Sequence, residues 1–266
     1  MVWCSRETSR LLCPIGKIKS KRQQAIADRE QDLLVIAEQI MEREGFSALT
    51  MDKLVSACSY SKGTVYNHFN SKEDLFCALC IKSMKQLLHL FRRASHFEGH
   101  HRERMLAIHF AYRLHAMTRP TLFLCVLTAQ TPAVREKSSA ERLQQQTELD
   151  QEVTKICTSI LEQAVAAGEL TIATPEYVDA LTFASWAISF GSNALMSGDC
   201  DSGVIERLDA EKALLFNVSL LMDGMGWLPL SREWDYQNSW QRIGSELFAA
   251  ELLAISDMDK APISQF

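Results

Sequence analysis

The chain has 266 residues, of which 47% are hydrophobic and 23% are charged, enough to bury at least one sizeable core in one or two domains. It contains no apolar run of about 18 residues, and Arg6, Glu7 and Arg10 stand where a signal peptide has its apolar segment. We therefore expect no membrane partner. Eight cysteines without the spacing of a disulfide framework are typical of a reducing compartment, so we expect a cytoplasmic protein.

Charge is divided unevenly along the chain. Residues 1–72 contain eleven Lys and Arg against eight Asp and Glu, a net charge of +3, whereas residues 73–266 have a net charge of −8. The densest basic cluster is "KIKSKRQQ", which contains Lys17, Lys19, Lys21 and Arg22. It indicates contact with a polyanion, and a solubilising tail is the alternative interpretation.

Apolar residues at helical spacing predict a first helix over residues 24–44 that ends at Gly45. Thr50 is then expected to cap a short second helix whose apolar side includes Leu54. Ser61 is expected to cap a short third helix with Val65 facing inward.

A long fourth helix is predicted from Ser71 to about residue 95, since Ser71 and Asp74 form a box-like start and an apolar face follows. Two short helices joined by the turn Cys58–Ser59–Tyr60 and followed by a long helix form the helix-turn-helix layout.

The third predicted helix has an unusual outward face. Val65 and Phe69 define its buried side, and at about 100° per residue Gly63 and Asn67 lie nearly opposite, with Thr64 and Tyr66 on the flanks. Glycine inside a helix costs about 1 kcal/mol relative to alanine, so its presence is explained if the backbone must approach another surface closely. Double-stranded DNA is such a surface, and solvated polar residues are the alternative.

The segment "GFSALTMDKLVSACSYSKGTVYNHFNSKEDLF", residues 45–76, resembles the DNA-binding domain of TetR-type (TetR/AcrR) transcriptional regulators. The glycine–aromatic pair, the capping threonine and the S-K-G-T-x-Y-x-H-F and S-K-E-x-L signatures occur in the family's order. The resemblance covers about seventy residues, including the first helix and the basic arm. It implies DNA contacts by Thr50, Lys62, Thr64, Tyr66, His68 and Lys72, with Lys72 on phosphate.

The turn departs from the family pattern, which usually has Gly-Val where this chain has Ser59 and Tyr60. We therefore expect Ser59 to hold a left-handed backbone conformation at a cost of about 1 kcal/mol. The ring of Tyr60 is expected either to be buried or to turn outward.

The rest of the chain also has helical patterns. We expect helices near 102–118, from Pro120 to about 130, from about 134 to Gly168, over 175–196 and over 202–223. The helix over 175–196 is apolar around most of its circumference and carries small residues, which indicates burial in a core or between subunits. The three tryptophans of "GMGWLPLSREWDYQNSW" are expected to be core or interface anchors.

Six histidines between residues 89 and 115 raise the alternative of a metal site. No pair has the spacing of a zinc-binding helix with a carboxylate partner, so we expect no metal and no cofactor. Cys77 and Cys80 form a C-x-x-C motif without a second pair, and Cys80 falls on the apolar stripe of its helix. No pattern of nucleophile and base or of phosphate-binding glycines indicates an enzyme.

The sequence therefore predicts an all-α chain with an N-terminal helix-turn-helix DNA-binding domain followed by a helical ligand-binding and dimerisation domain. We expect an N-terminal extension over 1–16, the DNA-binding domain with its basic arm over 17–75, the helical domain over 76–230 and a C-terminal helical extension over 231–266. The predicted DNA-binding set combines the basic arm with the third helix and its flanks: Lys17, Lys19, Lys21, Arg22, Thr50, Ser61, Lys62, Gly63, Thr64, Tyr66, Asn67, His68 and Lys72.

The expected function is that of a ligand-responsive regulator, a repressor by the family resemblance, which binds palindromic operator DNA as a homodimer. An unknown small apolar effector would release it from a pocket whose lining is predicted from residues on the helices that could enclose it: Phe110, Tyr112, Leu114, Phe123, Cys125, Phe183 and Trp186. Two alternatives remain open: these residues are plain core, or the C-terminal domain binds a partner protein.

Overall fold

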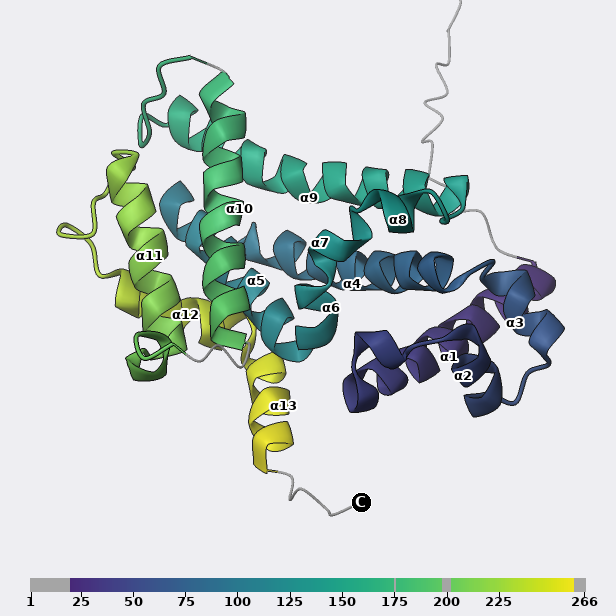
Figure 1. Cartoon of the computed structure of the whole chain (residues 1–266). Helices are drawn as coiled ribbons and strands as arrows, with labels where there is room; N and C mark the ends of the chain where they lie inside the picture. The colour runs from purple at the N-terminus through teal and green to yellow at the C-terminus, as the bar shows by residue number, and fades with distance from the viewer. Residues whose placement is uncertain (1–19, 175, 198–201, 261–266) are drawn as a thin grey trace, which may run out of the picture.

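A computed structural model describes residues 20–174, 176–197 and 202–260, and within these ranges every regular element is a helix. Figure 1 shows α1–α3 at one end of the molecule and α10–α12 at the other, with α4 and α9 running side by side between them. The predicted all-α fold is confirmed. No helix in the described ranges has both the length and the hydropathy that crossing a lipid bilayer requires.

The N-terminal elements are α1 (Lys21–Glu44), the 3₁₀ turn η1 (Phe46–Ala48), α2 (Met51–Ala57), α3 (Lys62–His68) and α4 (Lys72–Ala94). The middle of the chain contains α5 (His101–Thr118), α6 (Pro120–Leu124), α7 (Val126–Ala129), α8 (Pro132–Arg135) and α9 (Ala140–Ala166). The C-terminal elements are α10 (Glu176–Ser197), the 3₁₀ turn η2 (Ile205–Arg207), α11 (Ala210–Gly224), α12 (Tyr236–Leu247) and α13 (Ala249–Lys260).

The caps of the N-terminal helices follow the sequence. The Thr50 hydroxyl accepts a hydrogen bond from the Lys53 amide at 3.1 Å, and the Ser71 hydroxyl accepts one from the Asp74 amide at 3.0 Å. Helix α1 ends at Gly45, whose φ of 81° is unfavourable for residues with a side chain. The predicted helix boundaries are confirmed here, although α1 begins three residues earlier than expected because Ser20 and Gln23 form a capping box.

The single helix predicted from residue 134 to Gly168 is wrong at its start, since α8 and α9 are separate. The Ser139 amide donates to the Asp74 carboxylate at 2.9 Å, and the Ser71 hydroxyl donates to the Lys137 carbonyl at 3.2 Å. These contacts with the start of α4 hold residues 137–139 out of the helix. The predicted helix from Pro120 to 130 is likewise two short helices, and the one predicted over 202–223 is regular only from Ala210.

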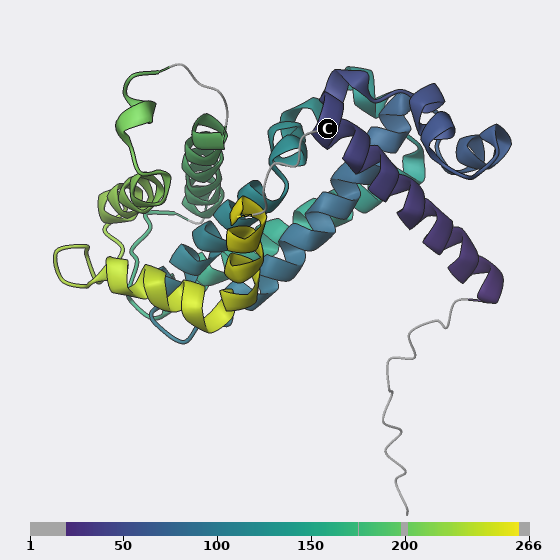
Figure 2. The same cartoon turned by 90° about the horizontal axis from the view of Figure 1, so that it is seen from below.

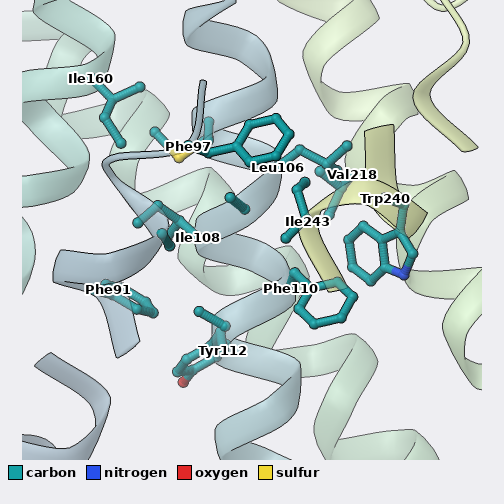
Figure 3. Close-up of a cluster of buried hydrophobic side chains, with 14 of the residues drawn as sticks. Phe91, Phe97, Leu106, Ile108, Phe110, Tyr112, Ile160, Val218, Trp240 and Ile243 are labelled. Carbon is teal, nitrogen blue, oxygen red and sulfur yellow. The ribbon is translucent and has the colours of Figure 1, made fainter. Parts of the chain in front are cut away.

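Two main buried cores share helix α4, and a third, minor cluster joins Cys77 and Ile81 of α4 to Leu149 of α9. The larger one lies among α5, α9, α11 and α12, where Figure 3 shows Trp240 beside Phe110, and it also contains Trp227 and Phe248. The smaller one joins α1–α3 to α4 and extends to Leu122 and Cys125 of the α6–α7 segment. The domain boundary predicted between residues 75 and 76 therefore falls inside α4. Residues on both sides of the boundary predicted at 231, such as Trp227 and Trp240, belong to the larger core.

Arg102 of α5 anchors the segment that leads into α12. Its buried guanidinium donates to the carbonyls of Trp227 at 2.6 Å and Pro229 at 2.9 Å, and it pairs with Asp223 at 2.8 Å. The guanidinium also lies 4.3 Å from the centroid of the Tyr236 ring. The C-terminal part of the described chain is thus fixed to the long middle helices.

Candidate nucleic-acid interface and internal cavity

Helix α3 is built as the sequence predicts. The Ser61 side chain caps it by accepting from the Thr64 amide at 3.2 Å, and its hydroxyl lies 2.9 Å from the Thr64 hydroxyl. Val65 and Phe69 are fully buried on the inner side. This packing leaves the opposite side of α3 exposed to solvent.

The exposed side of α3 carries Lys62, Gly63, Tyr66 and Asn67, while Thr64 is half-buried. The Lys62 ammonium lies 3.2 Å from the Asp52 carboxylate and 5.6 Å from the centroid of the Tyr66 ring. Its hydrogen bond to Asp52 raises the pKa of the Lys62 side chain, so the cation is maintained at neutral pH. The face is polar, carries one cation and has a bare backbone in its first turn.

Gly63 is not required by the packing of the protein itself. A Cβ placed there would meet only the Ser61 hydroxyl, at an ordinary 3.9 Å, and the residue lies in a regular helix. Alanine would therefore fit and would favour the helix by about 1 kcal/mol. The glycine instead leaves the backbone of the exposed face uncovered by a side chain.

His68 does not lie on this face. Its side chain is only 8% exposed, and its Nδ1 atom lies 3.5 Å from the Glu30 carboxylate of α1. The side chain of His68, the last residue of α3, turns toward α1, and its contact with DNA remains a prediction.

The turn between α2 and α3 is unstrained. No residue with a side chain has a positive φ in the part of the chain that the structure describes, so the expected left-handed conformation of Ser59 is wrong. The Tyr60 ring is half-buried against the N-terminal core, and its hydroxyl donates to the Asp32 carboxylate at 2.8 Å. The tyrosine thus joins the turn to α1.

The other predicted DNA contacts surround α3. The Lys72 ammonium lies 3.4 Å from the carbonyls of Phe46 and Ser47 and 4.8 Å from the Phe46 ring centroid, so it also holds α4 to η1. Lys21 and Arg22 are exposed in the first turn of α1, a helix that projects from the body (Figure 2). Lys17 and Lys19 lie outside the described residues.

Arg142 of α9 joins the candidate interface to the rest of the molecule. Its guanidinium contacts the Glu30 carboxylate of α1 at 3.0 Å, the His68 carbonyl at the end of α3 at 2.9 Å and the Asp74 carboxylate of α4 at 3.3 Å. Sequence reasoning missed this residue. Its partners lie at least 68 positions away, and no periodic pattern signals such a distant pairing.

A cavity of about 450 Å³ lies among α4, α5, α6, α7, α9 and α10 and opens to the surface beside the exposed side chains of Phe183 and Leu127. Four of the predicted ligand-binding residues line it: Tyr112, Phe123, Phe183 and Trp186. The Trp186 indole donates to the Tyr112 hydroxyl at 3.1 Å across the contact between α10 and α5. The cavity volume falls within the range of about 300–1,000 Å³ that small-molecule sites occupy.

Three other predicted ligand-binding residues do not line this cavity. Phe110 packs against Trp240 at 4.9 Å between ring centroids, and Figure 3 shows it turned away from Tyr112. Leu114 faces a separate groove beside α1, and Cys125 belongs to the N-terminal core. Phe110, Tyr112 and Leu114 share one helix, and steps of two residues rotate side chains by about 200°, which sends them to different sides.

The cavity wall is mostly apolar but contains buried polar groups. His109, Ser185 and Ser189 line it, and burial lowers the pKa of His109 to about 4, so its imidazole is neutral. The lining residues include Asp150 and Asp179, and no lysine or arginine is among them in the described ranges. The cavity therefore suits an apolar molecule.

The outer surface of α10 and α11 is strongly apolar. Phe183 is 64% exposed and Phe216 is 66% exposed, and Leu195 and Leu220 are also exposed. The two helices pack against each other, with the Asn217 amide donating to the Ser192 hydroxyl at 3.1 Å. Together they present an exposed hydrophobic face to solvent.

The histidines between residues 89 and 115 are dispersed. His109 and His115 are buried, His101 pairs with Glu169 at 2.9 Å, and His89 is exposed. No group of three or more metal-ligating side chains comes together within the ranges that the structure covers. Cys77 and Cys80 are buried free thiols in the core around α4.

Comparison with known proteins identifies the N-terminal part of the chain. The family described as bacterial regulatory proteins, tetR family, matches residues 33–79. The transcriptional regulator UidR of Escherichia coli K12 is 35% identical over 69 residues, which is 26% of this chain and 34% of UidR. The match thus spans about a third of the length of this curated relative.

Solved structures match over a larger share. A tetR-family regulatory protein from Rhodococcus RHA1 has a TM-score of 0.57 at 18% identity over 74% of this chain and 97% of its own. FadR from Bacillus subtilis, in complex with stearoyl-CoA, has a TM-score of 0.57 at 14% identity over 73% of this chain and 98% of its own. Residues 33–79 thus match the tetR family of bacterial regulatory proteins, and about three quarters of the chain has the helical fold of these solved structures.

Proposed function

We propose that the protein is a transcriptional regulator that acts in the cytoplasm, binds double-stranded operator DNA as a homodimer and is released by a small apolar effector. The observation that carries the DNA-binding part is the exposed face of α3, where Gly63 exposes the backbone between Lys62, Tyr66 and Asn67. A helix of this width fits the major groove, where polar side chains reach base edges. Repression is the sign of action that the family resemblance favours.

The placement of α9 supports control by an effector. One end of this helix carries Arg142, which contacts α1, α3 and α4, while Asp150 and Cys157 farther along it line the cavity. A molecule that binds in the cavity therefore contacts the same rigid helix that holds the end of α3. An effector acts by binding more tightly to the arrangement that does not fit the operator. FadR, which has the same fold, binds stearoyl-CoA.

The apolar outer face of α10 and α11 supports a two-fold dimer. One reading helix covers too few base pairs for specific binding, and helix-turn-helix dimers pair two half-sites. The face offers Phe183, Phe216 and Leu220 beside Gly191, at which an added Cβ meets nothing within 4 Å. A second copy of the chain covers this surface in the proposed assembly, and a partner protein is the alternative occupant.

Selection of genomic fragments by the purified protein, followed by footprinting, tests the proposed function. We expect one palindromic site protected by two subunits. Sedimentation of a Gly191→Arg variant tests the dimer, because the site has space for a side chain in the single chain. If the variant remains dimeric, this part of α10 is not in the interface. If the protein selects no DNA sequence, the proposed function as a transcriptional regulator is refuted.

A further inference from the structure

Three buried polar atoms in the cavity wall have no hydrogen-bond partner among the described residues: Nε2 of His109 and the hydroxyls of Ser185 and Ser189. All three side chains are more than nine-tenths buried. Leaving a buried polar group unpaired is unfavourable, and native structures contain few of them. Three such groups on residues that line one cavity indicate that something outside the described chain pairs with them.

Other polar groups of the cavity lining, by contrast, have hydrogen-bond partners within the protein. Thr182, on the same helix as the two serines, donates to the Val178 carbonyl at 2.8 Å. His115 lies 3.0 Å from the Ser83 hydroxyl. Ser185 and Ser189 are one turn apart on α10, so their hydroxyls share one face of the helix.

Charge restricts the partner further. The cavity lining contains the carboxylates of Asp150 and Asp179 and, in the described ranges, no lysine or arginine. A carboxylate or phosphate group inside it would be desolvated without a compensating cation. An ammonium group in its buried part would likewise lack an anion, because Asp150 and Asp179 are both exposed to solvent. An uncharged oxygen, by contrast, can accept from a serine hydroxyl, and a hydroxyl group can also donate to an imidazole nitrogen.

We propose that the cavity selects an uncharged, mainly apolar small molecule with a hydroxyl or ketone oxygen that pairs with His109, Ser185 and Ser189. The inference rests on the proposed function in one respect: it takes this cavity as the site where the effector binds. It differs from a site for acyl-CoA, because a coenzyme A group is anionic.

Probes with one carbon skeleton test the class of ligand. Calorimetric titration of the full-length protein at pH 7.5 compares 1-decanol and 2-decanone, below their solubility limits, with decanoate and decylammonium, below their micelle concentrations. We expect the alcohol and the ketone to bind, and decanoate to bind at least about ten-fold more weakly, since ten-fold corresponds to a modest desolvation cost of about 1.4 kcal/mol.

Variants test the three polar groups. The double change Ser185→Ala and Ser189→Ala, and separately His109→Phe, should each weaken decanol binding by roughly ten-fold, the effect of losing one or two hydrogen bonds. The same variants should be as stable as the wild type or more stable without ligand, because they remove unpaired buried groups. Ser192→Ala is the matched control: its hydroxyl is buried on α10 but already paired with Asn217, so it should lose stability and keep decanol affinity.

The proposal is overturned if no uncharged probe binds, if decanoate or decylammonium binds as tightly as decanol, or if the serine and histidine variants retain decanol affinity. A loss of stability in the double serine variant equal to that of Ser192→Ala also contradicts it, since the hydroxyls would then be paired within the protein. Operator binding is titrated separately with each variant. Selective DNA binding with the wrong probe preference refutes only the ligand class, whereas absent DNA binding refutes the proposed function.

Discussion

Replacing Arg142 by methionine tests whether α9 holds the DNA-binding helices in place. The change keeps a long aliphatic side chain and removes the guanidinium, which contacts Glu30, the His68 carbonyl and Asp74. It also removes the contact of the guanidinium with the Phe69 ring, whose centroid lies 5.1 Å away. Three elements of the N-terminal domain are then without their shared cation.

The expected cost follows from the burial of the partners. Removing one partner of a fully buried ion pair costs about 3–5 kcal/mol. Here the Asp74 carboxylate keeps the amides of Ser139 at 2.9 Å and Asn70 at 3.2 Å, and Glu30 is partly exposed. We therefore expect the free energy of unfolding to fall by about 2–3 kcal/mol.

Urea denaturation followed by far-UV circular dichroism measures this decrease, and operator titration by fluorescence anisotropy measures the effect on DNA binding. Arg92→Met is the matched control, because Arg92 also joins α4 to α9 through Glu152, but at the surface, where such a pair contributes about 0–1 kcal/mol. We expect Arg142→Met to weaken operator binding about ten-fold relative to this control, a typical coupling energy between sites. Equal stability and equal operator affinity in the two variants would refute the role of Arg142.

The remaining predictions concern the DNA-binding helix, the C-terminal anchor and pH. Gly63→Val should abolish operator binding with the fold intact, whereas Gly63→Ala should bind weakly although it stabilises α3 by up to about 1 kcal/mol, as titration and thermal denaturation will show. Lys72→Ala should weaken binding to the operator and to a scrambled duplex by the same factor. It should also make the slope of log affinity against log salt concentration shallower by about 0.9 for each phosphate that the variant no longer neutralises. Arg102→Met should lower the free energy of unfolding in urea by about 3–5 kcal/mol, because it leaves buried carbonyls and a carboxylate without their cation. Burial lowers the pKa of both His109 and His115 to about 4, below the unfolded value of about 6.5. The unfolded chain thus binds more protons between these values, so stability should fall by up to about 3 kcal/mol per histidine as pH drops from 6.5 to 4, and His115→Gln should flatten this dependence.

Local patterns in the sequence determined the helices of the DNA-binding domain. Ser61, Thr50 and Ser71 cap as predicted because a cap needs only an oxygen placed next to the first amides of its own helix. The buried and exposed sides of α3 also follow from spacing alone, since helical rotation places Val65 inward and Gly63 outward. Three of the seven residues predicted to bind a ligand do not line the cavity, because the helical period separates the faces of a helix without indicating which neighbour each face contacts.

Tertiary structure decided everything that depends on partners distant in the chain. The local pattern predicts a helix through Ser139, but the hydrogen bond from the Ser139 amide to Asp74 interrupts the helix there. Arg142 contacts residues that lie 68 and 112 positions away in the sequence. Tyr60 and His68 turn toward α1 for the same reason, since Asp32 and Glu30 supply partners there. The unpaired polar groups of the cavity are equally a property of the fold. Whether a buried hydroxyl has a hydrogen-bond partner depends on which helices pack around it. The sequence shows which residues are neighbours along one helix, but not which helices pack together.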